Sequence, residues 1–179
     1  MQPPLVIKPL EKSEAESAAK VLCRAFNEPA RDMRKQIDES FQHKSHRPVT
    51  FVASVNGKIV GVVRYRLYYA MRPGDEPVFG LYSLGVDPAF RKQGIGHTLV
   101  KHVEDYIANK TLKPGEQASI VLGDATKKDN PSSTFYEEVG YALQDNAQHP
   151  PKDGIPGMIK IIKRETAPQK KTAAPKLSQ

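Results

Sequence analysis

The residues best suited to chemistry stand in one short stretch of the chain: Arg91, Lys92, Gln93, Gly94, Ile95, Gly96 and His97. A β-rich run precedes this stretch and an amphipathic helical pattern follows it, so we expect a tight turn between a strand and a helix. The first turn of a helix has free backbone N–H groups and the positive end of the helix dipole. Glycines without Cβ atoms let a bulky anion approach that backbone, and the two cations add positive charge. These properties suit a pyrophosphate.

The glycine pattern does not by itself identify the pyrophosphate. The turn lacks the Gly-Lys-Ser/Thr sequence of a P-loop, which excludes that class of nucleoside triphosphate site. A dinucleotide fingerprint requires a third glycine, and Leu99 occupies that position. The two glycines could also serve only the geometry of the connection. On the turn alone, a binding site and a plain connection are about equally supported.

Hydrophobic periodicity predicts the elements that position this turn. Short apolar or alternating runs indicate strands at 5–7, 49–55, 58–69, 78–86, 118–122, 141–143 and 158–162. Apolar residues at three- and four-residue spacing indicate helices at 13–27, 30–43, 94–109 and 131–138. The order of these elements predicts an α+β fold with a mixed sheet.

Local signals refine this outline. Ser13 and Glu16 have the spacing of a capping box, which predicts a helix start at Ser13. The pair Asn56-Gly57 is a strong signal for a two-residue hairpin between neighbouring strands. We expect one domain over residues 1–164. From residue 165 the chain has few apolar residues to bury, so 165–179 is predicted to be a disordered basic tail.

Composition excludes several classes of protein. The chain has 179 residues and a net charge of +7, part of which lies in the tail. The basic residues form no clustered run and no base-stacking motif accompanies them, so a nucleic-acid partner is not expected. No apolar run has the length needed to cross a membrane, and no leader pattern begins the chain. We therefore expect a cytoplasmic protein without a membrane partner.

Two motifs resemble those of the GNAT-type N-acetyltransferases. Arg91, Gly94 and Gly96 match that family's phosphate motif, Arg/Gln-x-x-Gly-x-Gly/Ala, and the strand before it ends in a matching Val-x-Pro step. The second motif runs from Phe135 to Tyr141 with the sequence Phe-Tyr-Glu-Glu-Val-Gly-Tyr. The resemblance covers residues 5–164. It implies a layered fold in which a mixed, mostly antiparallel sheet of about seven strands is flanked by about four helices.

The resemblance also implies acetyl-CoA as cosubstrate and no metal. The backbone from Leu84 to Val86 is then expected to pair with the pantetheine arm like an added strand. Tyr136 matches the family's general acid, and a purely structural role beside Phe135 and Tyr141 stays open. The expected coenzyme contacts are Leu84, Gly85, Val86, Arg91, Lys92, Gln93, Gly94, Ile95, Gly96, His97, Asn130, Ser133 and Tyr136.

The sequence leaves the general base open. Many members of the family carry a glutamate on the fourth strand, and here that position is Tyr82, a poor base at neutral pH. Asp124, after the strand 118–122, is the better candidate, either directly or through water. The alternative role for Asp124 is an Asx-type turn, and the two roles are equally supported. Asn130 lies one residue from the family's usual asparagine position, and a helix-capping role is favoured for it.

The acceptor amine is not identified by the sequence. Its pocket is expected between three segments: 30–43, 70–77 and 144–157. Glu39, Asp75 or Glu76 could pair there with a cation. The leading function is an N-acetyltransferase that acts on a primary amine of a small molecule or protein, by direct attack in a ternary complex. The alternative is a non-catalytic module of the same fold that binds coenzyme A or a protein partner, and a homodimer is compatible with both.

Overall fold

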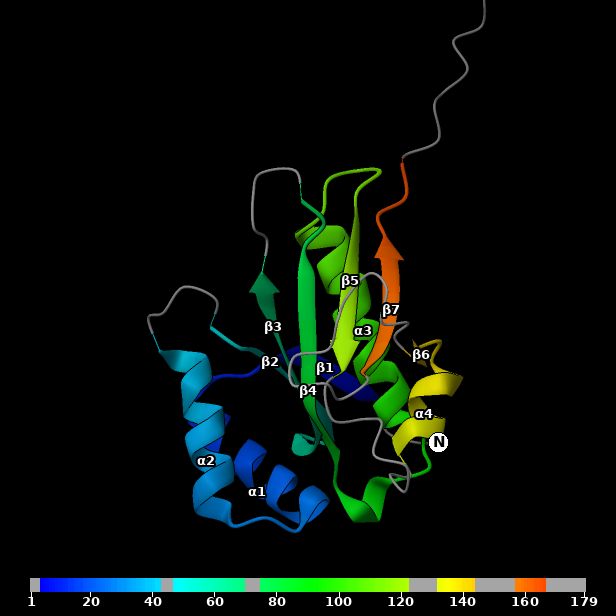
Figure 1. Ribbon diagram of the computed structural model, residues 1–179. Helices are drawn as coiled ribbons and strands as arrows, with labels where there is room; N and C mark the ends of the chain where they lie inside the picture. The colour runs from blue at the N-terminus through cyan, green and yellow to red at the C-terminus, as the bar shows by residue number, and fades with distance from the viewer. Residues whose placement is uncertain (1–3, 43–46, 70–74, 123–131, 144–156, 167–179) are drawn as a thin grey trace, which may run out of the picture.

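The computed structural model describes residues 4–42, 47–69, 75–122, 132–143 and 157–166. Seven strands in these ranges form one sheet in the order β1-β2-β3-β4-β5-β7-β6 (Figure 1). Every neighbouring pair is antiparallel except β4 and β5, which are parallel. The strands are β1 (Leu5–Pro9), β2 (Val49–Val55), β3 (Lys58–Tyr69), β4 (Val78–Val86), β5 (Gln117–Leu122), β6 (Ala142–Leu143) and β7 (Met158–Lys163).

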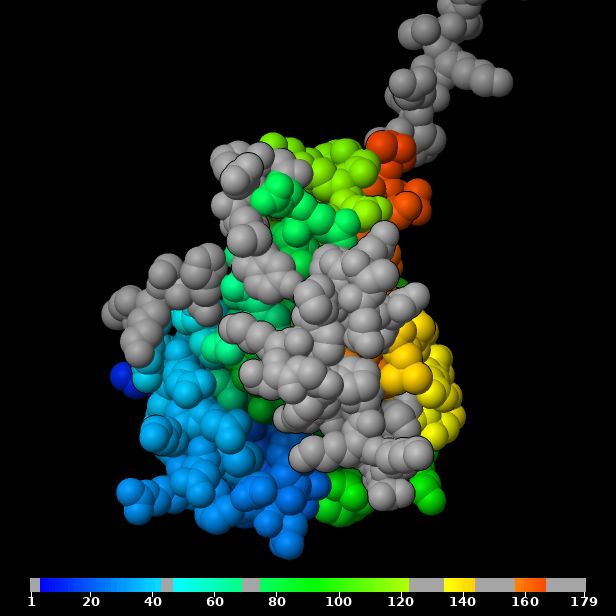
Figure 2. Space-filling model, in the orientation of Figure 1, coloured from blue at the N-terminus to red at the C-terminus, as the bar shows by residue number. Residues whose placement is uncertain are grey.

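Four α-helices flank the sheet within the same ranges. They are α1 (Ala15–Phe26), α2 (Ala30–Asp38), α3 (Ile95–Lys110) and α4 (Ser132–Glu138). Short 3₁₀ segments cover Lys12–Glu14, Glu39–Phe41 and Pro88–Phe90. Figure 2 shows α1 and α2 side by side as the blue and cyan part of one face of the molecule. The arrangement confirms the predicted layered α+β fold with a mixed, mostly antiparallel sheet.

Alternation of side chains along the strands separates two hydrophobic clusters. On β3, Val62 packs with α1 and α2, whereas Val63 and Tyr65 belong to the cluster that contains α3. This alternation places α1 and α2 on one face of the sheet and α3 on the other. The apolar stripe predicted for α3 is buried, with no member more than 4% exposed: Ile95, Leu99, Val103 and Ile107.

Strand β4 contains a bulge and then diverges from β5. Tyr82 pairs with Arg64 of β3 and Gly85 pairs with Val62, so Ser83 and Leu84 together oppose the single residue Val63. Ser83 has a φ of 53°, in the left-handed region. On its other side β4 pairs with β5 only from Val78 to Gly80. Within the described residues, the later part of β4 therefore has no strand partner on the β5 side, and the sheet opens there.

The predicted hairpin between β2 and β3 is confirmed. Asn56 and Gly57 have φ angles of 50° and 74°, the pair of positive values that a type I′ turn requires. The matching twist of this turn lets all of β2 pair with the first part of β3, from Lys58 to Tyr65. The hairpin thereby fixes the position of β3, against which β4 is aligned.

The capping box predicted at Ser13 and Glu16 is wrong. Residues 12–14 form a 3₁₀ turn, in which the Glu14 carboxylate accepts the Glu11 N–H at 3.1 Å. Lys8 explains the shift, because its ammonium lies within 3.0 Å of both Glu11 and Glu14 and holds the earlier residues together. The helix predicted at 30–43 is also shorter, since α2 ends at Asp38 and a 3₁₀ turn follows.

Several expectations concern segments outside the described residues. These are most of the predicted tail, the loop at 144–156 and the first part of the loop 70–77. In the parts that the structure does describe, no helix has the length and apolar character needed to cross a membrane.

An ion pair ties α1 to the end of β4. The Arg24 guanidinium donates to Asp87 Oδ2 through Nη2 at 2.8 Å and Nε at 3.1 Å, and the Ala89 N–H donates to Oδ1 at 3.1 Å. Burial alone would raise the pKa of Asp87, but the Ala89 N–H and the Arg24 guanidinium hold it below its usual value. This contact fixes the point at which the chain leaves β4 for the glycine turn.

Asp87→Asn is therefore expected to lower the free energy of unfolding by about 1 kcal/mol at pH 7, since Arg24 is partly exposed and loses only a screened carboxylate. The folded pKa lies below the unfolded one, so the stabilisation is present above about pH 4 and is lost as the pH falls through the folded pKa. Urea unfolding at pH 7 and pH 3 measures this, with the exposed Asp105→Asn as control. A difference between wild type and Asp87→Asn that is equal at both pH values would contradict the assignment.

Candidate functional site

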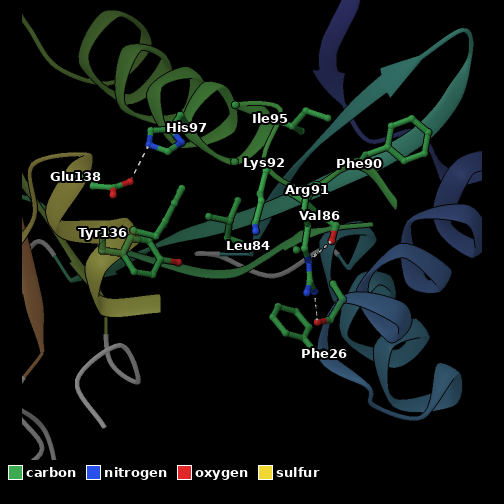
Figure 3. Close-up of a pocket in the computed structure, with 15 residues that line it drawn as sticks. Phe26, Leu84, Val86, Phe90, Arg91, Lys92, Ile95, His97, Tyr136 and Glu138 are labelled. Atoms are coloured by element: carbon green, nitrogen blue, oxygen red, sulfur yellow. Dashed lines mark hydrogen bonds and ion pairs between the residues drawn. The ribbon is translucent and has the colours of Figure 1, made fainter. Parts of the chain in front are cut away.

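A pocket of about 660 Å³ opens where β4 has left β5 (Figure 3). Its walls come from the end of α1, the second half of β4, the glycine turn, the start of α3, and α4. Ten of the thirteen predicted coenzyme contacts line it: Leu84, Gly85, Val86, Arg91, Lys92, Gly94, Ile95, Gly96, His97 and Tyr136. The remaining wall residues are Ala25, Phe26, Phe90, Phe135 and Glu138.

The turn before α3 has the geometry of an anion site. Lys92 and Gly94 both lie in the left-handed region, with φ of 60° and 76°, and Gly94 is the N-cap of α3. The backbone N–H and the hydroxyl of Thr98 both donate to the Gly94 carbonyl at 3.0 Å, which closes the first helical turn. The N–H groups of residues 95–97 have no acceptor among the described residues and form the free end of the helix.

The two glycines of the turn have different roles. Gly94 is required by its positive φ, and a Cβ there would meet open space. At Gly96 a Cβ would stand 3.2 Å from the Phe135 ring, so this glycine lets α4 pack closely against the start of α3. Gly96 also lines the pocket, so the predicted approach of an anion to its backbone stays a prediction. The structure adds a packing role, because the missing side chain lets the second motif pack against the first.

The cationic side chains at the pocket differ in their contacts. The Arg91 guanidinium donates to the Ala25 carbonyl at 2.8 Å and to the Val86 carbonyl at 3.3 Å, so it holds α1 against β4 as well as charging the wall. In Figure 3 the Lys92 ammonium points into the pocket. His97 stacks edge-on against Phe135 with ring centres 4.9 Å apart, and its Nε2 lies 3.6 Å from Glu138.

Tyr136 reaches the pocket from α4. Its ring meets Phe135 and Tyr141 edge-on, with centroid distances of 5.1 and 5.8 Å. Its hydroxyl points into the pocket on the side of Leu84 (Figure 3). Burial raises the pKa of Tyr136 to about 12, so the hydroxyl stays protonated at neutral pH. Tyr136 therefore packs against aromatic neighbours and also presents a protonated hydroxyl to the pocket.

The family is shown by a sequence model described as the Acetyltransferase (GNAT) family, which matches residues 15–141. The chain belongs to the GNAT acetyltransferase family. A search of curated protein sequences finds no match. GNAT acetyltransferases use acetyl-CoA, which agrees with a pocket bounded by the glycine turn.

Solved structures share the fold. A GNAT acetyltransferase from Staphylococcus aureus has 20% identity and a TM-score of 0.66, over 89% of this chain and 100% of that one. The ribosomal-protein-S18-alanine N-acetyltransferase from Escherichia coli has 17% identity and a TM-score of 0.59, over 93% and 98%. An aminoglycoside 6′-N-acetyltransferase in complex with coenzyme A has 16% identity and a TM-score of 0.60, over 87% and 95%. Identities this low show the fold alone.

Of the predicted GNAT site residues whose side chains the structure describes, one does not line the pocket. Gln93 is exposed in the turn and is not among the lining residues. Asp124 and Asn130 lie outside the described residues, as does the side chain of Ser133 on α4. Phe26 and Phe90 line the pocket but were not predicted. No local pattern marks them, because their position depends on how α1 and the turn after β4 pack together. Phe26 is 43% exposed in the structure.

Tyr82 stands where many GNAT proteins have a glutamate. Its hydroxyl is buried and has no hydrogen-bond partner among the described residues, and the Arg64 guanidinium lies 5.0 Å from its ring centre. Burial raises the pKa of Tyr82 to about 12, despite the opposing effect of Arg64 and Arg66. Tyr82 therefore remains protonated at neutral pH and does not act as a base there.

Two of the three carboxylates suggested as partners for a cationic acceptor are already engaged, whereas the exposed Asp75 has no partner among the described residues. Glu39 accepts a hydrogen bond from Arg64 at 3.0 Å. Glu76 accepts from Gln117 at 2.6 Å and from the Ser119 hydroxyl at 2.5 Å. The sequence could not show this because each contact joins residues at least 25 positions apart.

A buried ion pair anchors α4 behind the pocket. Lys160 of β7 donates to Glu104 of α3 at 2.8 Å and to the Val139 carbonyl, just after α4, at 2.7 Å. The same ammonium lies 5.6 Å from the Tyr141 ring centre, and burial together with Glu104 raises the pKa of Tyr141. Lys160 thus joins α3, β7 and the end of α4, and it fixes the helix that carries Tyr136.

Lys160→Met is expected to lower the free energy of unfolding by about 2 kcal/mol, because Glu104 is left buried without its cation. Replacing both partners, as Lys160→Met with Glu104→Leu, should recover most of that loss, because no uncompensated charge remains. Denaturant unfolding of the two variants measures the difference, with Lys101→Met, from an exposed pair, as control. Equal losses in the single and double variants would show that the ion pair does not anchor α4.

Proposed function

We propose that the protein transfers the acetyl group of acetyl-CoA to a primary amine of a small molecule or protein, by direct attack in a ternary complex. One observation carries the proposal. A single pocket connects the free N–H groups at the start of α3, the unpartnered edge of β4 and the protonated hydroxyl of Tyr136. These are a phosphate site, a site for an extended chain and a proton donor, in the order that a coenzyme thioester requires.

The pocket residues fit this coenzyme. The N–H groups of residues 95–97, the open space beside Gly94 and the Lys92 ammonium suit the pyrophosphate. The later part of β4, with Leu84 and Val86, offers backbone groups to an arm that adds to the sheet edge. Phe26 and Phe90 supply apolar walls. When bound, acetyl-CoA would supply the activated acyl group and a thiol leaving group.

The chain's own residues position the reactants and transfer the protons. Holding both reactants in one pocket replaces a bimolecular encounter by a positioned one, which is the largest contribution expected here. Tyr136 holds a proton for a departing thiolate, whose parent thiol has a pKa of about 8.5. Asp124 is proposed as the group that accepts the amine's proton, directly or through water.

A specific observation also favours a second function. The usual strand-four carboxylate is replaced by a tyrosine that stays protonated, and the lining carboxylate Glu138 is close to His97. A module that binds the coenzyme without turnover would need no carboxylate base at either position. Turnover with any amine excludes this alternative.

Isothermal titration with acetyl-CoA tests the coenzyme site. Wild type is expected to bind in the micromolar range. Gly94→Val should weaken binding by about tenfold or more, since its side chain would occupy the space for the pyrophosphate. Gly57→Val is the matched control, because Gly57 has a φ of 74° and equally open surroundings but lies outside this pocket. Equal affinities of the two variants would place the anion elsewhere.

Tyr136→Phe is expected to lower kcat by about 100-fold with little change in the KM for acetyl-CoA, because it removes the proton donor and keeps the ring. The raised pKa of Tyr136 means that its proton is retained to about pH 12. The wild-type rate should therefore rise with pH as the amine is deprotonated, without a falling limb below pH 10. Tyr141→Phe is the control, since its hydroxyl does not line the pocket. An unchanged kcat in Tyr136→Phe would remove the acid role.

A further inference from the structure

We infer that the acceptor carries an oxyanion, a carboxylate or phosphate, close to its amine, and that Arg66 binds it from between Tyr68 and Tyr82. The inference rests on the proposed acetyl transfer and specifies its second substrate. It concerns the surface of β3 and β4 beyond the coenzyme pocket, on the side away from the glycine turn.

The position of this surface follows from strand pairing. Leu84 is the last lining residue of the coenzyme pocket in the direction of the β4 start, and Tyr82 precedes it by two residues. Across the strand pair, Arg64 is opposite Tyr82 and Arg66 is opposite Gly80. The strands lie side by side in Figure 1. Because the pyrophosphate end lies at the glycine turn, an acceptor has to approach from the other end of β4, where these side chains stand.

Arg66 is held in place without being neutralised. Its guanidinium carbon lies 5.1 Å from the centre of the Tyr68 ring and 5.7 Å from that of Tyr82, so it is bracketed by two aromatic rings. The residue is exposed, and no carboxylate pairs with it among the described residues. A planar fork of donors that is already oriented is the preferred partner of a carboxylate or phosphate.

Gly80 allows the Tyr68 ring to lie close to the strand beside Arg66. A Cβ at Gly80 would overlap the Tyr68 ring, so the ring lies directly on the strand at this position. The ring therefore forms one fixed wall beside Arg66. Tyr82, held under the Arg64 guanidinium, forms the other wall.

The surroundings carry more donors than acceptors. Arg64 is 1% exposed, and Glu39 and Gln36 take its terminal nitrogens, but its Nε has no partner. The buried Tyr82 hydroxyl also has none among the described residues. Among the described residues, the charged groups that act on that hydroxyl are two arginines and one glutamate, a net positive charge. An oxyanion would balance it.

The same arrangement offers few free carboxylates to an acceptor that is only cationic. Glu39 accepts from Arg64, and Glu76 accepts from Gln117 and Ser119. Of the three carboxylates named for such an acceptor, only the exposed Asp75 has no partner among the described residues. Arg66 would therefore select an acceptor that carries an anionic group beside its amine.

Matched amine pairs test the inference. The pairs are γ-aminobutyrate with γ-aminobutyramide, phosphoethanolamine with ethanolamine, and a peptide with glutamate at its second position with its glutamine counterpart. For at least one pair, wild type should show a kcat/KM at least about tenfold higher for the anionic member. The pair that responds distinguishes a carboxylate, a phosphate and an acidic peptide as the source of the oxyanion.

In Arg66→Gln, the kcat/KM for the anionic member of the responding pair should be close to the kcat/KM for its neutral partner. Because each ratio is compared between wild type and variant, differences in amine basicity cancel. Arg66→Lys keeps the charge without the planar fork and should retain part of the preference. Lys110→Gln, at the exposed end of α3 on the other face of the sheet, is the control for lost charge and should keep the wild-type ratio. Ratios near one for every pair in wild type, or ratios unchanged in Arg66→Gln, would overturn the inference.

A binding experiment decides the matter independently of turnover. Glutarate is titrated into protein saturated with coenzyme A, and Arg66→Gln should bind it at least about tenfold more weakly than wild type. Equal affinities would overturn the inference, as would a loss of acetyl-CoA affinity in Arg66→Gln, which would assign Arg66 to the coenzyme. Failure of the proposed function has a different signature, because wild type would then not bind acetyl-CoA.

Discussion

The separation of β4 from β5 after Gly80 is the constraint on which the site depends. β4 stays paired with β3 throughout, and the bulge at Ser83 and Leu84 bends it while that pairing continues. A sheet that opened without such support would leave backbone groups buried and unpaired, at considerable energetic cost. Here the open edge lines a pocket, so its backbone groups are available to a ligand instead.

The walls of the pocket are fixed by contacts between distant parts of the chain. Arg24 with Asp87 brings the end of α1 to the end of β4, and Arg91 repeats this connection through two carbonyl groups. On the other side, the close packing of Phe135 on Gly96 sets α4 against α3. Lys160 then holds the far end of α4 through a charge that is mostly removed from water. Tyr136 is positioned by these contacts, and it has no side-chain hydrogen bond to the described residues.

The charge around Tyr82 differs from what a glutamate at this position of β4 would provide. Tyr82 is buried and protonated, two arginines stack on it, and one carboxylate is close enough to oppose them. Stacked guanidinium groups keep their in-plane donors free, so aromatic contact orients Arg66 without neutralising it.

The sequence alone determined the helices and strands, the hairpin at Asn56-Gly57 and the family. The helices, strands and hairpin depend on periodicity and on the φ preferences of single residues, which act over a few positions. The family follows from two short motifs, which are also local. It also identified ten of the residues that line the pocket, because the glycine turn and the adjoining strand are continuous in the chain. The capping box at Ser13 was misplaced, since the side chain that decides it, Lys8, belongs to a preceding strand.

Only the tertiary structure decided where the sheet opens, why Gly94 and Gly96 differ, and which charges stay unpaired. Arg24 and Asp87 are 63 residues apart, and Lys160 and Glu104 are 56 apart, so no local pattern could pair them. The hydrogen bonds of Glu39 and Glu76 are likewise invisible in the sequence, because the partners of these two carboxylates lie far away along the chain. Such contacts depend on how whole elements pack, and packing is a property of the complete core and not of any single segment.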